Sequence, residues 1–341
     1  MSTDNRHDVK FTFSEAPPYG QRTQIVPGID WIRLALPFAL DHVNCWHLHG
    51  EGESCLIDTG VHTKGTLESW NSVFADSPWP EKLLVTHFHP DHSGLAGWFA
   101  QKGCEIVSSE IEWGIVQSLN AIEDGAYQDY YANWYVQHGV EQSYIDAVNK
   151  LGNTFKSKTL APPKNAQYLS DGDTVEFGGR SFQVMKGQGH SPDMIMLYSE
   201  QDSLLIAADQ VLPTITPNVS LMPSTPDPNP LAGFLSCIER LKSLPEETLV
   251  LPSHGLPFTG LHQRIDYLSQ HHEDRLAEIE TALKQEQHAA ALFPVLFKRK
   301  LDNQQLSFAL GETLAHVTYL ESQSRVTRQT RDGVDYYRTV G

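Results

Sequence analysis

Four potential metal ligands fall within six residues of this chain, in the segment His87-Phe88-His89-Pro90-Asp91-His92. The apolar run that precedes them, Lys82 to Val85, predicts a short β-strand. Side chains that follow the carboxyl end of such a strand lie at the edge of a sheet, where α/β proteins build their sites. Because histidine and aspartate are suitable zinc ligands, the segment predicts a metal site rather than an ordinary polar turn.

Three later residues repeat this placement of one ionisable side chain at the end of a predicted strand. His190 follows the apolar run 182–185, Asp209 follows the run 204–208, and His254 follows the run 248–251. Their order and contexts indicate that these histidines and acids are organised into one site.

The segment Thr86 to Gly94 matches the signature H-x-H-x-D-H-x-G, and from about residue 29 to 260 the sequence resembles the metallo-β-lactamase superfamily. Asp58, in Leu-Ile-Asp-Thr-Gly, matches the first acidic motif of that family. The Gly-His-Ser-Pro context of His190 resembles the glyoxalase-II-like thioesterases and their lactonase relatives. The C-terminal part resembles a winged-helix extension found on one subgroup of these hydrolases.

This resemblance implies two divalent metal ions, which we expect to be zinc, although the same ligands bind iron or manganese. One ion would be held by His87, His89 and His190. The other would be held by Asp91, His92 and His254, and Asp209 would bridge the two.

Such a site implies hydrolysis by a metal-bound hydroxide, because the metal lowers the pKa of its water towards about 7. No serine or cysteine nucleophile is then needed. Asp91 would also orient the hydroxide or relay a proton. Asp58 would fix a ligand histidine, or cap its own turn, or both.

The ligands at strand ends and the two β-rich halves that flank an insertion predict an αββα sandwich, two mixed β-sheets with helices outside, over residues 1–265. Residues 1–28 are predicted to be an irregular lead-in, and residues from about 109 to 160 a helical insertion. Residues 266–341 predict a winged-helix-like domain. Its expected elements are the helices 271–285, 289–300 and 304–322, followed by a β-hairpin over 325–339.

Aromatic side chains recur every three or four residues in the insertion, at Tyr127, Tyr130, Tyr131, Trp134 and Tyr135. Such a stripe packs a helix onto its own domain in the ordinary case. The alternative is a lid over an apolar acyl group, with Tyr131 and Trp134 as substrate-binding residues.

A second His-x-His pair, His47 and His49, lies in a predicted strand with no later carboxylate partner, so we do not expect it to bind metal. The four cysteines form no Cys-x-x-Cys pair, so neither a thiolate zinc site nor a redox motif is visible.

The net charge of −17 makes nucleic acid and anionic membranes poor partners, because the chain repels phosphate groups. No signal peptide is apparent in the polar residues 1–13, and the apolar stretch 29–40 is too short to span a bilayer. We therefore expect a cytoplasmic protein with free thiols.

The predicted function is hydrolysis of an acyl bond in a small molecule, a thioester in preference to a lactone. The alternative is an endoribonuclease or phosphodiesterase of the same fold. Residues 271–341 carry ten acidic and nine basic residues, and the predicted recognition helix 304–322 has neither lysine nor arginine. Because DNA-reading helices present cations, we interpret this domain as a module for packing, homodimer formation or completion of a pocket.

Overall fold

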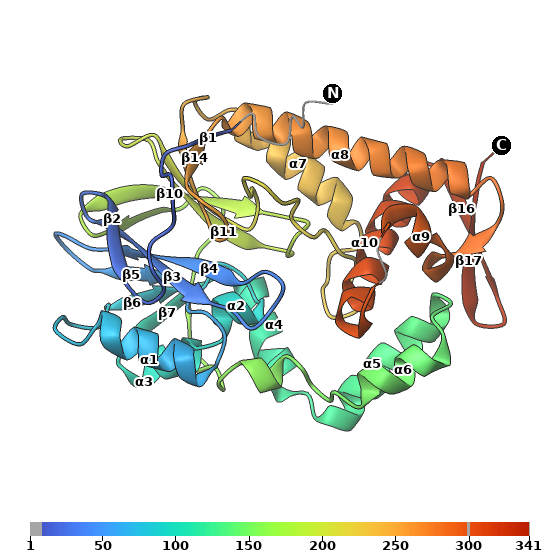
Figure 1. Cartoon of the computed structure of the whole chain (residues 1–341), viewed down its shortest axis with the longest axis horizontal. Helices are drawn as coiled ribbons and strands as arrows, with labels where there is room; N and C mark the ends of the chain where they lie inside the picture. The colour runs from blue at the N-terminus through green and yellow to red at the C-terminus, as the bar shows by residue number, and fades with distance from the viewer. Residues whose placement is uncertain (1–8, 299–300, 341) are drawn as a thin grey trace. The chain divides into compact units, whose positions relative to one another are not determined.

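A computed structural model describes residues 9–298 and 301–340, which divide by their contacts into two units (Figure 1). Unit 1 comprises residues 1–121, 155–217 and 237–265, and unit 2 comprises residues 122–154, 218–236 and 266–341. The start of the predicted lead-in, 1–8, and the end of the predicted helix 289–300 lie outside the described residues. In the part of the chain that is described, no helix combines the length and apolarity needed to cross a membrane.

Unit 1 contains two seven-stranded sheets, each with parallel and antiparallel pairs. The first sheet has the order β2 (Arg22–Val26), β3 (Ile29–Ala35), β4 (His42–Leu48), β5 (Cys55–Ile57), β6 (Lys82–Leu84), β7 (Glu105–Ser108), β8 (Gln167–Tyr168). The second has the order β1 (Lys10–Phe11), β14 (Phe258–Thr259), β13 (Leu249–Pro252), β12 (Leu204–Ala208), β11 (Met194–Ser199), β10 (Arg180–Gly187), β9 (Thr174–Phe177).

Apolar side chains from both sheets form one buried core. They alternate along the strands, so that they share one face of each sheet. The first sheet contributes Ile29, Trp31, Trp46 and Leu48, and the second contributes Phe182, Val184, Ile195, Leu197, Leu204 and Ile206. Each such side chain stabilises the fold by about 1.5–3 kcal/mol relative to exposure. This face-to-face packing of two mixed sheets confirms the predicted sandwich.

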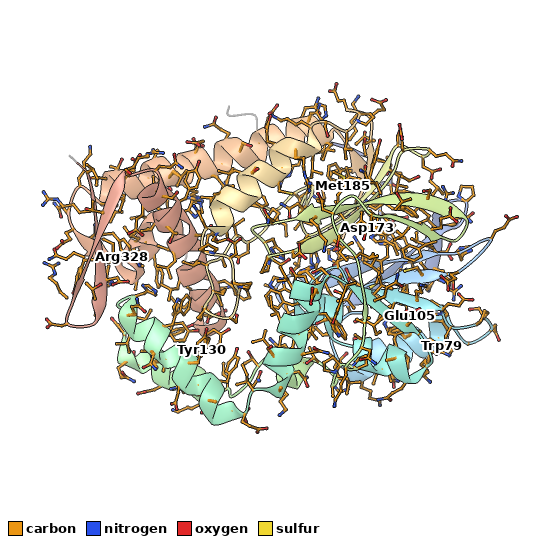
Figure 2. The ribbon with its side chains drawn as sticks, turned by 180° about the vertical axis from the view of Figure 1, so that it is seen from behind. Trp79, Glu105, Tyr130, Asp173, Met185 and Arg328 are labelled. Carbon is orange, nitrogen blue, oxygen red and sulfur yellow. The ribbon has the colours of Figure 1, made fainter. Side chains whose placement is uncertain are left out.

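Helices cover the outer side of the first sheet, where Figure 1 shows α1 (Lys64–Val73) and α3 (Ala96–Gln101). The indole N–H of Trp70 in α1 donates to the carbonyl oxygen of Thr59 at 2.7 Å. The Trp70 ring also packs edge-on against Phe99 of α3, with ring centroids 5.3 Å apart. Trp79, labelled in Figure 2, packs edge-on against Trp98 at 5.1 Å and completes this aromatic layer.

The prediction of an irregular lead-in was wrong for two segments. Strand β1 pairs with β14, and β2 pairs with β3 in an antiparallel register. Both strands lie at sheet edges and are exposed or half-buried. They therefore lack the strong alternation of apolar residues that predicts a strand from sequence.

Unit 2 combines part of the helical insertion with the C-terminal elements. Helix α4 (Glu110–Ala121) and the short helix η1 (Lys156–Lys158) of the insertion belong to unit 1, whereas α5 (Asp124–Gln137) and α6 (Gln142–Asn149) belong to unit 2. The division falls within α7 (Pro230–Leu241) and α8 (Leu261–Ala282). The remaining elements of unit 2 are β15 (Gln287–His288), η2 (Ala289–Leu292), α9 (Phe293–Leu296), α10 (Asn303–Ser322), β16 (Val326–Arg331) and β17 (Val334–Thr339). The three strands pair in the order β15-β17-β16.

The first and third predicted C-terminal helices and the hairpin are present, although the first helix begins at Leu261 rather than at His271. The prediction of one helix over 289–300 was wrong, because the described residues there form only η2 and the short α9, which ends at Leu296.

A sequence division after residue 265 leaves residues 122–154 and 218–236 in the catalytic domain, whereas their contacts place them in unit 2. Residues 122–154 contact α10 within unit 2. The hydroxyl oxygen of Ser307 in α10 lies 2.7 Å from that of Tyr135 in α5 and 2.8 Å from that of Tyr144 in α6.

The aromatic stripe packs within unit 2. The Tyr131 hydroxyl donates to Ser224 Oγ at 3.0 Å, and Trp134 lines a cavity of about 310 Å³ with Met222, Leu314 and Tyr337. Tyr130, labelled in Figure 2, is exposed. These contacts favour the packing interpretation, and the substrate-binding role of Tyr131 and Trp134 stays a prediction.

Candidate metal centre

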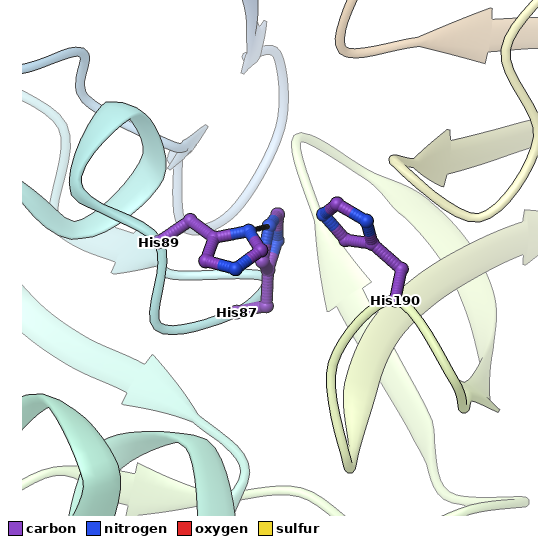
Figure 3. A group of neighbouring side chains, drawn as sticks. All are labelled: His87, His89 and His190. Atoms are coloured by element: carbon purple, nitrogen blue, oxygen red, sulfur yellow. Dashed lines mark hydrogen bonds between the residues drawn. The ribbon is translucent and has the colours of Figure 1, made fainter. Parts of the chain in front are cut away.

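The strand ends of both sheets bring the predicted ligands to one edge of unit 1. His87 to His92 follow β6 and enter the short helix α2 (Pro90–Ser93), and His190 follows β10. Asp209 and His254 follow the parallel pair β12 and β13. Figure 3 shows His87 and His89 reaching from one loop towards His190 on the other.

Close packing fixes the loop that carries four of these residues. The N–H groups of Thr59 and Gly60 donate to the carbonyl oxygens of His92 and Asp91, each at 3.0 Å. A Cβ atom on Gly94 would lie 2.5 Å from the Gly60 carbonyl oxygen, which is closer than atoms approach. The glycine of the signature is therefore required by this contact between α2 and the turn after β5.

His87, His89 and His190 form the first group, with one potential ligand atom from each residue within 4.8 Å of the others. His87 Nε2 lies 2.9 Å from His89 Nδ1 (dashed in Figure 3), and the His89 and His190 rings are 4.6 Å apart. Burial lowers the pKa of His87, and it lowers that of His89 to about 3. Both rings are therefore neutral, which is the form that binds a metal.

Asp91, His92 and His254 form a second group of the same compactness. Asp91 Oδ2 lies 3.5 Å from His92 Nε2 and 3.5 Å from His254 Nε2. Burial alone raises the pKa of Asp91, but the neighbouring His92 and His254 lower it below its ordinary value, so this carboxylate is ionised.

Asp209 lies between the two groups. Its Oδ2 is 3.2 Å from His190 Nε2 and also 3.6 Å from His92 Nε2, whereas its Oδ1 is 3.4 Å from His254 Nε2. Ala208, directly before it, has a φ of 47°, a left-handed conformation that is unusual for a residue with a side chain. The strand thus turns sharply at the point where it presents this carboxylate.

Asp58 lies behind His92, on the side away from the other ligands. Its Oδ2 is 2.8 Å from His92 Nδ1, and the N–H of Thr86 donates to its Oδ1 at 2.9 Å. An Nδ1–H bond to this carboxylate leaves Nε2 of His92 as the ring atom that faces the cluster. This geometry supports the predicted role of Asp58 in fixing a ligand histidine.

The donors of this cluster fit a divalent metal ion. Its residues are largely buried, and among the residues that the structure describes neither His92 Nε2 nor Asp209 Oδ1 has a hydrogen-bond partner. Buried polar atoms without partners are costly, and a cation would satisfy them. The four cysteines are buried, free of disulfides and outside these groups.

Sequence reasoning missed Glu112, a fully buried acid in α4. Its Oε2 accepts the N–H of Phe88 at 2.9 Å, and its Oε1 accepts the N–H of Asp193 at 2.7 Å. One carboxylate therefore ties together the loops that carry His87, His89 and His190. The available signal was an acidic residue on the helix face of Ile115, Val116 and Leu119, where an apolar residue is expected.

His42 supports the imidazole of His254. The structure places it behind His254, whose Nδ1 donates to the His42 carbonyl oxygen at 2.6 Å. The His42 ring also accepts the N–H of Gly255 at its Nε2, at 2.8 Å. These two bonds hold the imidazole of His254 in its position.

Lys158 is a cation whose pKa is influenced by the carboxylate of Asp91. Burial lowers the pKa of its ammonium group, and the negative charge of Asp91 opposes that lowering. The Nζ atom lies 4.8 Å from the centre of the Phe38 ring. A half-buried cation on an aromatic ring is suited to hold an anionic part of a ligand.

The comparisons with known proteins agree with this geometry. Residues 39–254 match the metallo-beta-lactamase superfamily, and residues 276–340 match the metallo-beta-lactamase-like C-terminal domain. The crystal structure of a beta-lactamase domain protein from Burkholderia ambifaria is 34% identical with a TM-score of 0.90, over 98% of this chain and 99% of that chain. A probable metallo-hydrolase of Bacillus subtilis is 23% identical over 91% of this chain and 97% of its own length. An acyl-coenzyme A thioesterase of Homo sapiens is 24% identical over 67% of this chain and 78% of its own length.

Proposed function

Because the chain belongs to the metallo-beta-lactamase superfamily, we propose that it hydrolyses a small-molecule acyl bond with two divalent metal ions, zinc by preference. The observation that carries the proposal is the position of Asp209, whose carboxylate lies against His190 of one group and against His92 and His254 of the other. His87, His89 and His190 would hold one ion, and Asp91, His92 and His254 the other.

Two bound ions would supply a water of lowered pKa and an electrophile for the carbonyl oxygen. The chain's own residues would guide the proton and position the metal ligands. Asp91 Oδ2 faces both His92 and His254 and would help to hold the ion there, and the carboxylate would also orient the attacking water or relay its proton to the leaving group. Asp58 and Glu112 would keep the ligands in place while this happens.

A thioester is the acyl bond that we favour, with a lactone second. The human relative is an acyl-coenzyme A thioesterase, which supports this choice of class. Lys158 adds a half-buried cation, which would hold one of the phosphate groups that make the coenzyme A leaving group anionic. Whether Tyr131 and Trp134 contact the acyl chain is a separate part of the proposal.

A phosphodiester or RNA substrate is the rival, and the charges of the C-terminal hairpin disfavour it. Three of its four arginines already pair with acids: Arg325 with Glu280, Arg328 with Glu321, and Arg331 with Glu286. Cations that are neutralised within the protein contribute little to binding phosphate groups.

The test is metal analysis followed by turnover of acyl thioesters, lactones, β-lactams, phosphodiesters and RNA. We expect thioester hydrolysis that a chelator abolishes and zinc restores. Turnover of phosphodiesters with none of any thioester or lactone would contradict the proposal and favour the nuclease.

A further inference from the structure

The second His-x-His pair, His47 and His49, is not isolated in the structure. The sequence offered no later carboxylate, but an earlier one comes from the neighbouring strand. Asp30 of β3 is the direct cross-strand partner of His47 on β4. Cross-strand partners have their side chains on the same face of the sheet, and so do residues two apart on one strand. The three side chains therefore meet on one face.

Their potential ligand atoms lie within 4.8 Å of one another. His49 Nε2 is 3.0 Å from Asp30 Oδ2, and the rings of His47 and His49 are 5.2 Å apart. Two imidazoles and one carboxylate at this spacing are a typical ligand set for zinc and related divalent ions.

An independent observation concerns His47. This residue is 5% exposed, and within 9–298 and 301–340 neither of its ring nitrogens has a hydrogen-bond partner. A buried polar group without a partner costs about 1–3 kcal/mol, which makes an imidazole at this position expensive unless something else binds it. Burial also lowers the pKa of His47 to about 3, so the ring is neutral and its lone pair is available.

We propose that Asp30, His47 and His49 form a peripheral binding site for a zinc-class divalent ion, with solvent as the fourth ligand. The side chain of His49 is 37% exposed, which gives the ion an entry path and room for water. The charges near His47 are Arg22, which opposes a cation, and Glu81, which favours one. Arg22 is also attracted by the charge of Asp30, but it donates to Ser77 Oγ at 2.7 Å and lies over the Phe74 ring.

This site does not depend on the proposed function. Its ligands lie on β3 and at the end of β4, whereas those of the candidate metal centre follow β6, β10, β12 and β13. A bound ion would join β3 to β4 and stabilise the folded state, since it binds the folded chain only.

The test compares the zinc content of the full chain with that of two variants, His47→Leu and His49→Ala. Each protein is equilibrated with the same free zinc concentration and analysed for metal per chain. We expect each variant to hold one ion fewer than the unmodified chain, whatever number the candidate metal centre holds. Thermal stabilisation by added zinc should also decrease in both variants.

His262→Leu is the matched control, because it removes an imidazole of the same unit that bonds only the Leu244 carbonyl oxygen in the described structure. It should leave the zinc content unchanged. If His47→Leu fails to fold, His49→Ala decides alone, since its side chain is partly exposed. Unchanged zinc content in His49→Ala, or a gain in stability of His47→Leu with no lost ion, would show that His47 is only a core residue.

Discussion

The backbone N–H of Phe88 donates a hydrogen bond to Oε2 of Glu112, at 2.9 Å. The other oxygen of the same carboxylate accepts the N–H of Asp193. Phe88 lies between two predicted ligands and Asp193 lies three residues after a third, so this buried acid sets the distance between two ligand loops.

Glu112→Gln should weaken metal binding by about 10–100-fold, as substitutions behind metal ligands do. The amide NH₂ would face a backbone N–H and could not accept its hydrogen bond. The measurement is the metal dissociation constant, from competition with a chelator of known affinity. Glu110→Gln is the control, because Glu110 is exposed on the same helix. If both variants and the unmodified chain have equal dissociation constants, Glu112 does not position the metal ligands.

Asp209→Ala should lose most of the metal of the candidate centre and lower turnover by more than about 100-fold, since even partners of ligands cost 10–100-fold. The reason is the loss of the one carboxylate that faces both ligand groups. Metal per chain and kcat are measured together. Asp173→Ala, at an exposed position labelled in Figure 2, should change neither. Two retained ions and full turnover in Asp209→Ala would show that the assignment of ligands is wrong.

Lys158→Gln should raise KM for a coenzyme A thioester by about tenfold or more, because a hydrogen bond to a charged group contributes about 1.5–3 kcal/mol. The KM for a short thioester with an uncharged leaving group should stay the same. Lys164→Gln, at an exposed position in the same unit, serves as the control. Equal effects on the charged and uncharged substrates would exclude a role in leaving-group recognition.

Glu312→Gln should change how stability depends on pH. Burial raises the pKa of Glu312 in α10 from its ordinary value of 4.5 to about 7, although Arg275 and Asn218 lower it in part. A raised pKa means that the folded state holds the proton more tightly than the unfolded chain. The contribution of Glu312 is therefore fully present below about pH 4.5 and is lost as the pH rises through about 7.

Melting temperatures of both proteins at pH 5 and pH 8 measure this effect. The unmodified chain should lose stability relative to Glu312→Gln between the two values. Burial lowers the pKa of the nearby His272 to about 2 and of His316 to about 4, and both titrate in the opposite sense. Because these histidines are present in both proteins, they cancel in the comparison. A difference in melting temperature that is independent of pH would contradict the assignment to Glu312.

The sequence was sufficient to predict the two-sheet fold and the residues that gather at its edge, because each of these residues directly follows an apolar strand. Their function as ligands stays a prediction. Other relationships are not local and left no such signal. Asp30 meets His47 only through the register of β3 and β4. Glu112 reaches its partners through a helix that otherwise has an ordinary apolar face.

The contacts that place α5 and α6 of the insertion in unit 2 are also non-local. Tyr135 meets its hydroxyl partner Ser307 across a separation of 172 residues. No pattern within the insertion indicates which distant segment will cover its aromatic stripe. Helical periodicity predicts that a face is buried, but it does not identify what buries it.

The separation of 172 residues also determines how long after Tyr135 its partner Ser307 is synthesised. Ribosomes add about 5–20 residues per second, so Ser307 follows Tyr135 out of the ribosome after roughly 9–35 seconds. During this interval Tyr131, Trp134 and Tyr135 have been synthesised, but their native cover in α10 does not yet exist. The nascent chain therefore exposes an aromatic surface long enough for chaperones to bind it, or for chains on neighbouring ribosomes to associate through it.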